Sequence, residues 1–358
     1  MKKIVAIFIF LYFIQGCKKS PVAPIPNHNH DSYYFPALTG DIWEQKTPES
    51  LGWDVNKLNE AFDFAATKNS YGLIMLHNGK IVREQYWNNW TKDTRYFIAS
   101  AGKSVIGFLM GIAQQDGIVN INDKTSKYLG AGWTSLPAEK EDLITLKNNL
   151  SMTTGLDDDV VDLNCEDPAC LIYKADAGTR WAYHNAPYRL LHDVLSNASG
   201  LTLQQYSKQK LFDKIGMSNS IWINSILWCT TRDAARFGSL ILNKGVWNGT
   251  PLLSDLNYFN AMTNSSQDLN KAYGYLFWLN GKSSFMAPTL QTVFNAPLVP
   301  SAPNDMLLAL GKDDKKIYIV PSLNVVVVRL GDASGASLLG PSSFDNELWQ
   351  KLKPAIKY

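Results

Sequence analysis

Histidine and cysteine are scarce in this chain of 358 residues, which contains five histidines and four cysteines. Two of the histidines lie in a proline-rich segment near the N-terminus, so few remain from which to assemble a Ser-His-Asp triad. The G-x-S-x-G turn that carries the nucleophile of α/β-hydrolases is also missing. No second Cys/His pair lies at zinc-ligand spacing. We therefore expect no α/β-hydrolase triad, no metal site and no cofactor.

An excess of one charge is also missing. The chain has 34 basic and 32 acidic residues, well mixed, for a net charge of +2. Because no basic block stands out, we do not expect a nucleic-acid partner. The content of 46% hydrophobic and 18% charged residues is that of an ordinary globular protein, and no internal repeat is visible.

No apolar run is long enough to span a bilayer. The run Ile4–Ile14 has eleven residues, whereas a membrane-spanning helix needs roughly 20. It follows a Met-Lys-Lys start and precedes a Gln-Gly-Cys ending, so residues 1–16 are predicted to be a secretory signal. The Gly-Cys ending resembles the lipobox of bacterial lipoproteins, which implies lipidation of Cys17; the alternative is an ordinary signal cut nearby. We expect an exported protein, anchored by lipid on the periplasmic or cell-surface side of a bacterial membrane.

The order of patterns along the chain predicts the fold class. Residues 17–40 contain four prolines and read as a tether, which leaves 41–358 as the folded domain. Two β-rich runs flank the hairpin signal Asn78-Gly79. A mainly helical stretch over about 118–245 follows, then further strands and a C-terminal amphipathic helix. This order favours an α+β fold, with an antiparallel sheet flanked by helices and a helical lobe inserted between its two halves.

The cysteines fit an oxidising compartment. Cys165 and Cys170 bracket a turn-like Glu-Asp-Pro-Ala sequence, so we expect a local disulfide, with two free thiols as the alternative. Cys229 is left over and is expected to be buried.

The stretch Ser-Ala-Gly-Lys-Ser at 100–104 opens an apolar helix and allows three interpretations. A phosphate-binding loop would require glycine at position 97, which is Phe97, so that interpretation fails. A serine at a helix N-terminus with a lysine one turn along can be an activated nucleophile, which predicts Ser100 and Lys103 as catalytic. The alternative is a purely structural helix start. A second S-x-x-K match, Ser207 to Lys210, lies in a polar helix and is expected to be a solvated face.

A proton-transfer partner is available further along. Tyr183 and Asn185 lie two residues apart, just before a helix, and can point into one cavity. A phenol can accept and return a proton, and an amide can hold a lysine and a substrate. We therefore expect Tyr183 to act as acid and base and Asn185 to bind lysine and substrate.

Taken together, five segments resemble the serine β-lactamase and penicillin-binding-protein superfamily. The similarity is greatest to its class C-like branch, which includes carboxylesterases and 6-aminohexanoate-dimer hydrolases. The segments follow the family's order, at residues 97–117, 143–158, 177–191, 230–247 and 309–332. The resemblance implies a β-lactamase/transpeptidase-like fold, acylation of Ser100, activation by Lys103, and Tyr183 as general base and then acid.

The family's third motif, Lys-Thr-Gly or His-x-Gly on a strand, is where this sequence departs. Gly311-Lys312-Asp313 stands there, with a lysine but neither the hydroxyl residue nor the following glycine. The resemblance implies that these residues bind substrate and that a backbone N–H near 312–315 completes the oxyanion hole. A solvated hairpin turn is the alternative. Because the hydroxyl helps to hold the carboxylate of β-lactams, antibiotic hydrolysis is put in doubt.

We therefore expect an exported serine hydrolase that cleaves a small ester or amide, with a small molecule or short peptide as its substrate. A D-amino-acid peptide or peptidoglycan hydrolase, or a β-lactamase, is the alternative on the same machinery. A catalytically retired binding lipoprotein is the alternative of another class. An acidic stretch at 157–167 either favours cationic substrates or is a solvated loop.

Overall fold

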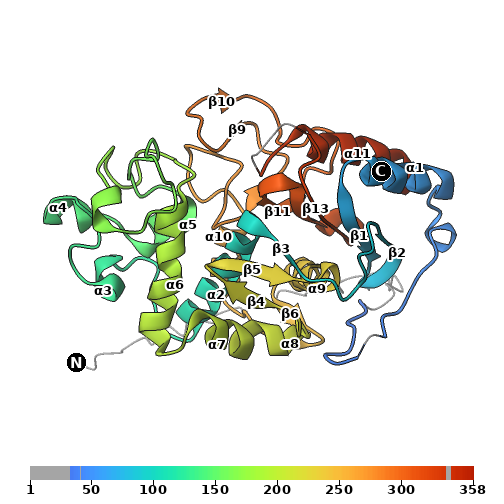
Figure 1. Cartoon of the computed structure of the whole chain (residues 1–358), viewed down its shortest axis with the longest axis horizontal. Coiled ribbons are helices and arrows are strands. Elements are labelled where there is room, and N and C mark those ends of the chain that lie inside the picture. The colour runs from blue at the N-terminus through green and yellow to red at the C-terminus, as the bar shows by residue number, and fades with distance from the viewer. Residues whose placement is uncertain (1–32, 41, 336–339) are drawn as a thin grey trace, which may run out of the picture. The chain divides into compact units, whose positions relative to one another are not determined.

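A six-stranded antiparallel sheet joins the two ends of the domain, in the order β2-β1-β13-β12-β11-β8. In this computed structural model, residues 33–358 are described except residue 41 and residues 336–339. The predicted signal peptide, Cys17 and the part of the predicted tether up to residue 32 lie outside the described residues. The N-terminal strand β1 pairs with the C-terminal β13, with Met75 opposite Val327. The two halves of the sheet, blue and red in Figure 1, thus come from opposite ends of the domain, as the sequence predicts.

The sheet strands are β1 (Ser70–His77), β2 (Lys80–Tyr86), β8 (Trp278–Leu279), β11 (Leu307–Gly311), β12 (Lys315–Val320) and β13 (Val325–Gly331). The short strands outside it are β3 (Tyr96–Phe97), β4 (Ile221–Ile223), β5 (Ile226–Cys229), β6 (Val246–Trp247), β7 (Thr250–Pro251), β9 (Phe285–Met286) and β10 (Val293–Phe294). The predicted hairpin is formed, since Asn78 and Gly79 both have positive φ, of 48° and 78°, as a two-residue turn between β1 and β2 requires.

The helices are α1 (Val55–Thr67), α2 (Gly102–Gln115), α3 (Ser126–Leu129), α4 (Ala138–Glu141), α5 (Leu146–Ser151), α6 (Asn185–Ser199), α7 (Leu203–Ser207), α8 (Asp213–Ile215), α9 (Thr231–Leu242), α10 (Leu256–Met262) and α11 (Ser343–Ile356). None of the helices within the described part of the chain is long and apolar enough to cross a membrane. Helices α1 and α11 pack on one face of the sheet, and α9 packs on the other (Figure 1).

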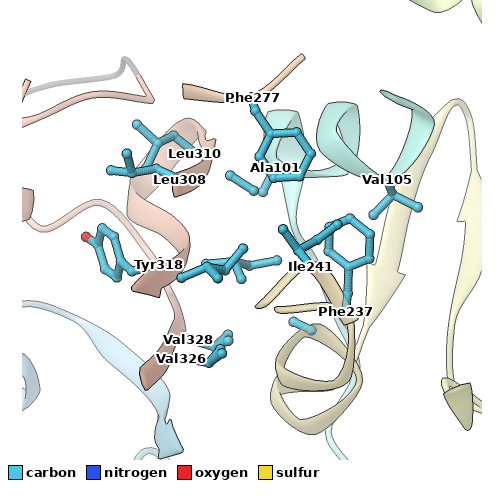
Figure 2. Packing of buried hydrophobic residues seen from close by; sticks show 14 of the residues in the cluster. Ala101, Val105, Phe237, Ile241, Phe277, Leu308, Leu310, Tyr318, Val326 and Val328 are labelled. Carbon is cyan, nitrogen blue, oxygen red and sulfur yellow. The ribbon is translucent and has the colours of Figure 1, made fainter. Parts of the chain in front are cut away.

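The main core lies between the sheet and helices α9 and α2. Figure 2 shows Phe237 and Ile241 of α9 facing Val326 and Val328 of β13, with Ala101 and Val105 beside them. Helix α9 approaches so closely that a Cβ on Gly238 would lie 2.6 Å from a methyl of Val326. Ala101 is fully buried in this core. The residue that follows the expected nucleophile is therefore fixed by core packing.

The inserted lobe is shorter than the sequence predicts. It contains α3–α8 and a small sheet of order β3-β5-β4. Helix α9, placed by the sequence in the lobe up to residue 245, belongs instead to the sheet layer because it packs on β12 and β13. The apolar face of α9 needs a large apolar surface to cover it, and only the sheet provides one.

The predicted tether is also too long at its C-terminal end. Tyr34 N–H donates to the Asn78 carbonyl at 2.9 Å, and the carbonyls of Pro36 and Ala37 accept from the Arg236 guanidinium at 3.3 and 2.9 Å. The Phe35 ring packs edge-on against Trp247 at a centroid distance of 5.0 Å. The prolines suggested a linker, but the aromatic side chains at 33–35 bind this segment to the domain.

Candidate active site

Ser100 lies in a tight turn between β3 and α2. Residues Ala99–Ala101 form a 3-10 turn that leads directly into α2. Ala99 has φ of 49°, a left-handed conformation that residues with a Cβ adopt at a cost of about 1 kcal/mol or more. As an amide of the first helical turn, the Ser100 N–H has no intrahelical acceptor. The turn therefore presents both the hydroxyl and a free N–H of Ser100.

Helix α2 is buried all round, and this determines the chemistry of Lys103. Every residue from Gly102 to Ala113 is buried, and the Lys103 side chain is only 4% exposed. Burial, with a smaller contribution from the nearby positive charge of Arg189, lowers the Lys103 pKa from 10.5 to about 7. At neutral pH roughly half of the Lys103 side chains are then uncharged. A lysine in this state can accept a proton.

The Lys103 amine is held by four groups. Its Nζ donates to Ser100 Oγ at 3.0 Å and to Asn185 Oδ1 at 2.9 Å. It also lies over the rings of Tyr183 and Tyr188, 5.0 and 4.3 Å from their centroids. The two rings favour the ammonium form, whereas burial favours the neutral amine. The geometry directs the amine to the expected nucleophile.

Tyr183 lies just before α6, next to the same serine. Burial raises the Tyr183 pKa by more than the nearby side chains of Ser100 and Trp278 lower it. The ring stacks on Trp278 at 5.7 Å with an interplanar angle of 24°. Burial raises the Tyr183 pKa above its ordinary value, so the phenol remains protonated at neutral pH. At neutral pH the Tyr183 phenol therefore carries a proton that it can donate.

Four of the expected residues line one cavity of about 300 Å³, whereas Tyr183 is not among its lining residues. Ser100, Lys103, Asn185 and Lys312 all line it, although they come from three distant segments. The sequence analysis did not single out the other lining residues, which are Ala99, Asn164, Tyr188, Arg189, Asn224, Ser225 and Ile226. A larger cavity of about 500 Å³ lies elsewhere, against residues 35–38 and the end of α2, with none of the expected catalytic groups.

The third motif reaches the cavity through Lys312, whereas Gly311, expected to bind substrate, is not among the lining residues. A Cβ on Gly311 would lie 2.3 Å from the Ile98 carbonyl and 3.3 Å from the Ala101 amide nitrogen, so the end of β11 packs directly against the nucleophile turn. Asp313 does not line the cavity, contrary to its expected role; its carboxylate lies 3.2 Å from Lys315 Nζ. The reason is local, since Asp313 has φ of 58° and the turn points its side chain back along β12.

Three of the six acids in the loop of residues 157–167 form ion pairs. Asp157 pairs with Lys174 at 3.3 Å, Asp158 with Arg180, and Glu166 with Arg189 at 2.7 Å. None of these acids lines the cavity. The disulfide between Cys165 and Cys170 is formed, as expected, and Cys229 is a buried free thiol.

One sequence signal, the spacing along a helix, could have found two of the additional cavity residues. Tyr188 and Arg189 lie three and four positions after Asn185, which places all three on one face of α6. Asn224 and Ser225, both with positive φ, form the turn between β4 and β5. The second S-x-x-K pair is structural, since buried Ser207 accepts from Trp222 Nε1 and Lys210 pairs with Asp116.

Comparison with known proteins relates the part of the chain that carries this site to a known family. Residues 67–237 match the family model described as Beta-lactamase, a segment that includes Ser100, Lys103, Tyr183 and Asn185. An uncharacterized protein of Alkalihalophilus pseudofirmus is 22% identical over 330 residues, which cover 80% of this chain and 90% of that protein.

Solved structures share the fold at low identity. A Bacillus anthracis protein assigned as a 6-aminohexanoate-dimer hydrolase aligns with a TM-score of 0.65 and 16% identity, over 87% of this chain and 86% of that one. A penicillin-binding protein homologue from Caulobacter crescentus aligns with a TM-score of 0.63 and 14% identity, over 84% and 97%. The fold is thus that of serine β-lactamases and penicillin-binding-protein-like hydrolases, and residues 67–237, which carry the Ser-x-x-Lys turn, match the Beta-lactamase family model.

Proposed function

We propose that this protein is an exported serine hydrolase that cleaves a small ester or amide through an acyl-enzyme on Ser100. The observation that carries the proposal is the buried Lys103 amine, 3.0 Å from Ser100 Oγ, with a pKa lowered to about 7. A buried amine that is half neutral at pH 7 can activate a hydroxyl that water would leave inert. No partner other than a small substrate is needed for this chemistry.

The proton path follows from the two pKa shifts. Neutral Lys103 takes the proton of Ser100 Oγ as the oxygen bonds to the substrate carbonyl carbon. Tyr183, whose raised pKa keeps its phenol protonated, then donates its proton to the departing alkoxide or amine. Lys103 can restore that proton to the phenolate. The resemblance implies Tyr183 as the first base, and this remains a prediction, but the two pKa shifts favour Lys103 for that step.

The developing oxyanion would be held by two backbone N–H groups. One is that of Ser100, free at the helix start, and the other would come from the turn after Gly311, which packs on the Ile98–Ala101 backbone. A water attacking the acyl carbonyl from the cavity would complete the cycle, with Lys103 or Tyr183 accepting its proton. The product acid leaves and Ser100 is regenerated.

The cavity supports small esters and amides over β-lactams. Its volume of about 300 Å³ is at the lower end of ligand pockets. The hydroxyl residue that would follow Lys312 in the family's third motif is replaced by Asp313, which turns away. Export is supported by the local disulfide, which is typical of oxidising compartments.

A peptide substrate with a free carboxylate is the second candidate. Lys312 and Arg189 line the cavity and no carboxylate does. A C-terminal carboxylate would be attracted to these cations, as in a D-amino-acid peptide. Turnover of D-Ala-D-Ala peptides, compared with a neutral ester of similar size, distinguishes the two candidates.

A fluorophosphonate that labels activated serines tests the proposal. Intact mass and peptide mapping should show one adduct, on Ser100, in the wild type. Ser100→Ala should take no label, whereas Ser225→Ala, which removes a hydroxyl from the same cavity, should label normally. A folded wild type that takes no label from probes of different sizes would remove the hydrolase proposal and leave the binding lipoprotein as the interpretation.

A further inference from the structure

The loop of residues 162–166 is docked on the first turn of α6, beside Lys103. The Ala186 N–H donates to the Leu163 carbonyl at 2.9 Å, and Arg189 Nη1 donates to the Asn164 carbonyl at 3.3 Å. Arg189 Nε also pairs with Glu166 at 2.7 Å. The loop contains Cys165, which forms the disulfide with Cys170. These contacts hold the Asn164 side chain against Asn185.

A directional chain of hydrogen bonds runs through these side chains. Asp162 Oδ1 accepts from the backbone N–H of Asn164 at 2.8 Å and from its Nδ2 at 3.1 Å. An ionised carboxylate only accepts, so it selects the nitrogen end of the Asn164 amide. The oxygen end then faces Asn185, whose Nδ2 donates to it at 3.1 Å. Only Oδ1 of Asn185 remains for Lys103, and it accepts from Nζ at 2.9 Å.

The orientation of the Asn185 amide matters for the base. A neutral amine has two N–H bonds and one lone pair. With Oδ1 facing it, Lys103 must offer an N–H to Asn185, and the lone pair is free to accept the Ser100 proton. With Nδ2 facing it, the amide would donate to that lone pair and compete with Ser100. A free asparagine could adopt either orientation, because its two ends have nearly the same shape.

We propose that Asp162 and Asn164 are positioning residues that fix the Asn185 amide and thereby keep the Lys103 lone pair for Ser100. The expected effect on Ser100 reactivity rests on the proposed function, whereas the expected effect on the Lys103 pKa does not. Both residues are exposed and lie outside the core, so substitutions there should leave the fold intact. Neither residue touches the reacting atoms.

Three variants test the chain of hydrogen bonds. Asn164→Leu removes both ends of the amide and frees Asn185 to turn. Asn164→Asp keeps an acceptor towards Asn185 Nδ2 and is the conservative rescue. Asp167→Asn is the matched control. This acid is exposed and lies in the same disulfide loop, and among the described residues its side chain forms no hydrogen bond with Asp162, Asn164 or Asn185.

Two measurements are made on each full-length variant. The first is the rate of Ser100 labelling by fluorophosphonate against pH, read on the plateau above the acid limb. We expect Asn164→Leu to lose about fivefold on this plateau, since one hydrogen bond of about 1 kcal/mol decides the orientation. Asn164→Asp should stay within about threefold of wild type and Asp167→Asn should be unchanged.

The second measurement is the Lys103 pKa, followed by NMR of the lysine ¹³Cε without any turnover. Loss of a fixed acceptor disfavours the ammonium, so Asn164→Leu should lower this pKa, whereas Asn164→Asp should not. Equal labelling plateaus and equal Lys103 pKa values in Asn164→Leu and wild type would overturn the inference. If the wild type takes no label but its Lys103 pKa still falls in Asn164→Leu, the proposed function fails while the positioning role stands.

Discussion

Replacing Lys103 by methionine should abolish labelling of Ser100 and yet stabilise the protein at neutral pH. Methionine keeps the buried stem and removes the amine. The fall in pKa from 10.5 to about 7 is about 3.5 units, and at about 1.4 kcal/mol per unit the buried ammonium costs about 5 kcal/mol. Because half of the lysine is neutral at pH 7, roughly 4 kcal/mol of that cost remains there.

Lost contacts offset part of this gain. The variant loses the hydrogen bonds to Ser100 and Asn185, at about 1 kcal/mol each. It also loses the contacts with the rings of Tyr183 and Tyr188, together about 1 kcal/mol. The net stabilisation at pH 7 is then about 1 kcal/mol, which for a domain of this size is a rise in Tm of about 2 °C.

The pH dependence gives the sharper test. Between pH 7 and 10.5 the unfolded chain keeps the Lys103 proton that the folded protein has lost, so wild-type stability rises with pH across this window. The methionine variant lacks this pH-dependent contribution to the free energy of unfolding. The variant should therefore be more stable than wild type at pH 7, lose its advantage as pH rises, and be the less stable protein near pH 10.

Thermal unfolding followed by tryptophan fluorescence suits a chain with 11 tryptophans. Lys210→Met is the control, because Lys210 lies at the surface and pairs with Asp116. The control should show no such pH-dependent difference in Tm. A difference between wild type and Lys103→Met that is constant from pH 7 to 10 would refute the argument that burial depresses the Lys103 pKa. Labelling in the same variant should fall by about 10³ or more.

Two other predictions follow from the site. The rate of Ser100 labelling should fall about tenfold per pH unit below about pH 7, because protonation of Lys103 removes the base; a rate that is flat down to pH 5 would exclude Lys103 from that role. Gly311→Ala should slow labelling by about tenfold or more and lower Tm, because its Cβ would lie 2.3 Å from the Ile98 carbonyl. Gly335→Ala, with no atom within 4 Å of its Cβ, is the control and should behave as wild type in both measurements.

Local features of the site were predictable from the sequence because helix geometry fixes them. Ser100 and Lys103 lie one turn apart at a helix start, and Tyr183 and Asn185 precede a helix that the sequence also shows. The order of strands and helices likewise predicted a sheet closed by both ends of the domain. In each case the signal spans a few neighbouring residues or a strong periodic pattern.

Contacts between distant segments were not predictable in this way. Asn164 reaches Asn185 only because the disulfide loop folds back on α6, and no periodic pattern records that docking. Asn224 and Ser225 enter the cavity through the pairing of β4 with β5. The tether ends earlier than its prolines predict, because the aromatic residues at 33–35 bind residues 33–38 to the domain.

The departure in the third motif changes the residues of the turn but keeps its position. Asp313 and Asp314 both have positive φ, of 58° and 59°, which glycine would adopt without strain. Here Arg329 Nη1 donates to both of their carbonyls, at 3.1 and 2.9 Å.

Beneath the same turn, the Asp314 carboxylate faces Lys316 at 3.1 Å, and Lys316 also pairs with Asp345 of α11 at 2.9 Å. All three side chains are buried. Breaking such a pair would leave an uncompensated charge in the core, so these ion pairs hold the turn in its conformation. Buried ion pairs thus replace the conformational freedom of glycine and keep Lys312 at the cavity, whereas the turn of residues 311–314 itself carries no hydroxyl side chain. The catalytic half of the site is therefore maintained independently of the half that would recognise a β-lactam carboxylate.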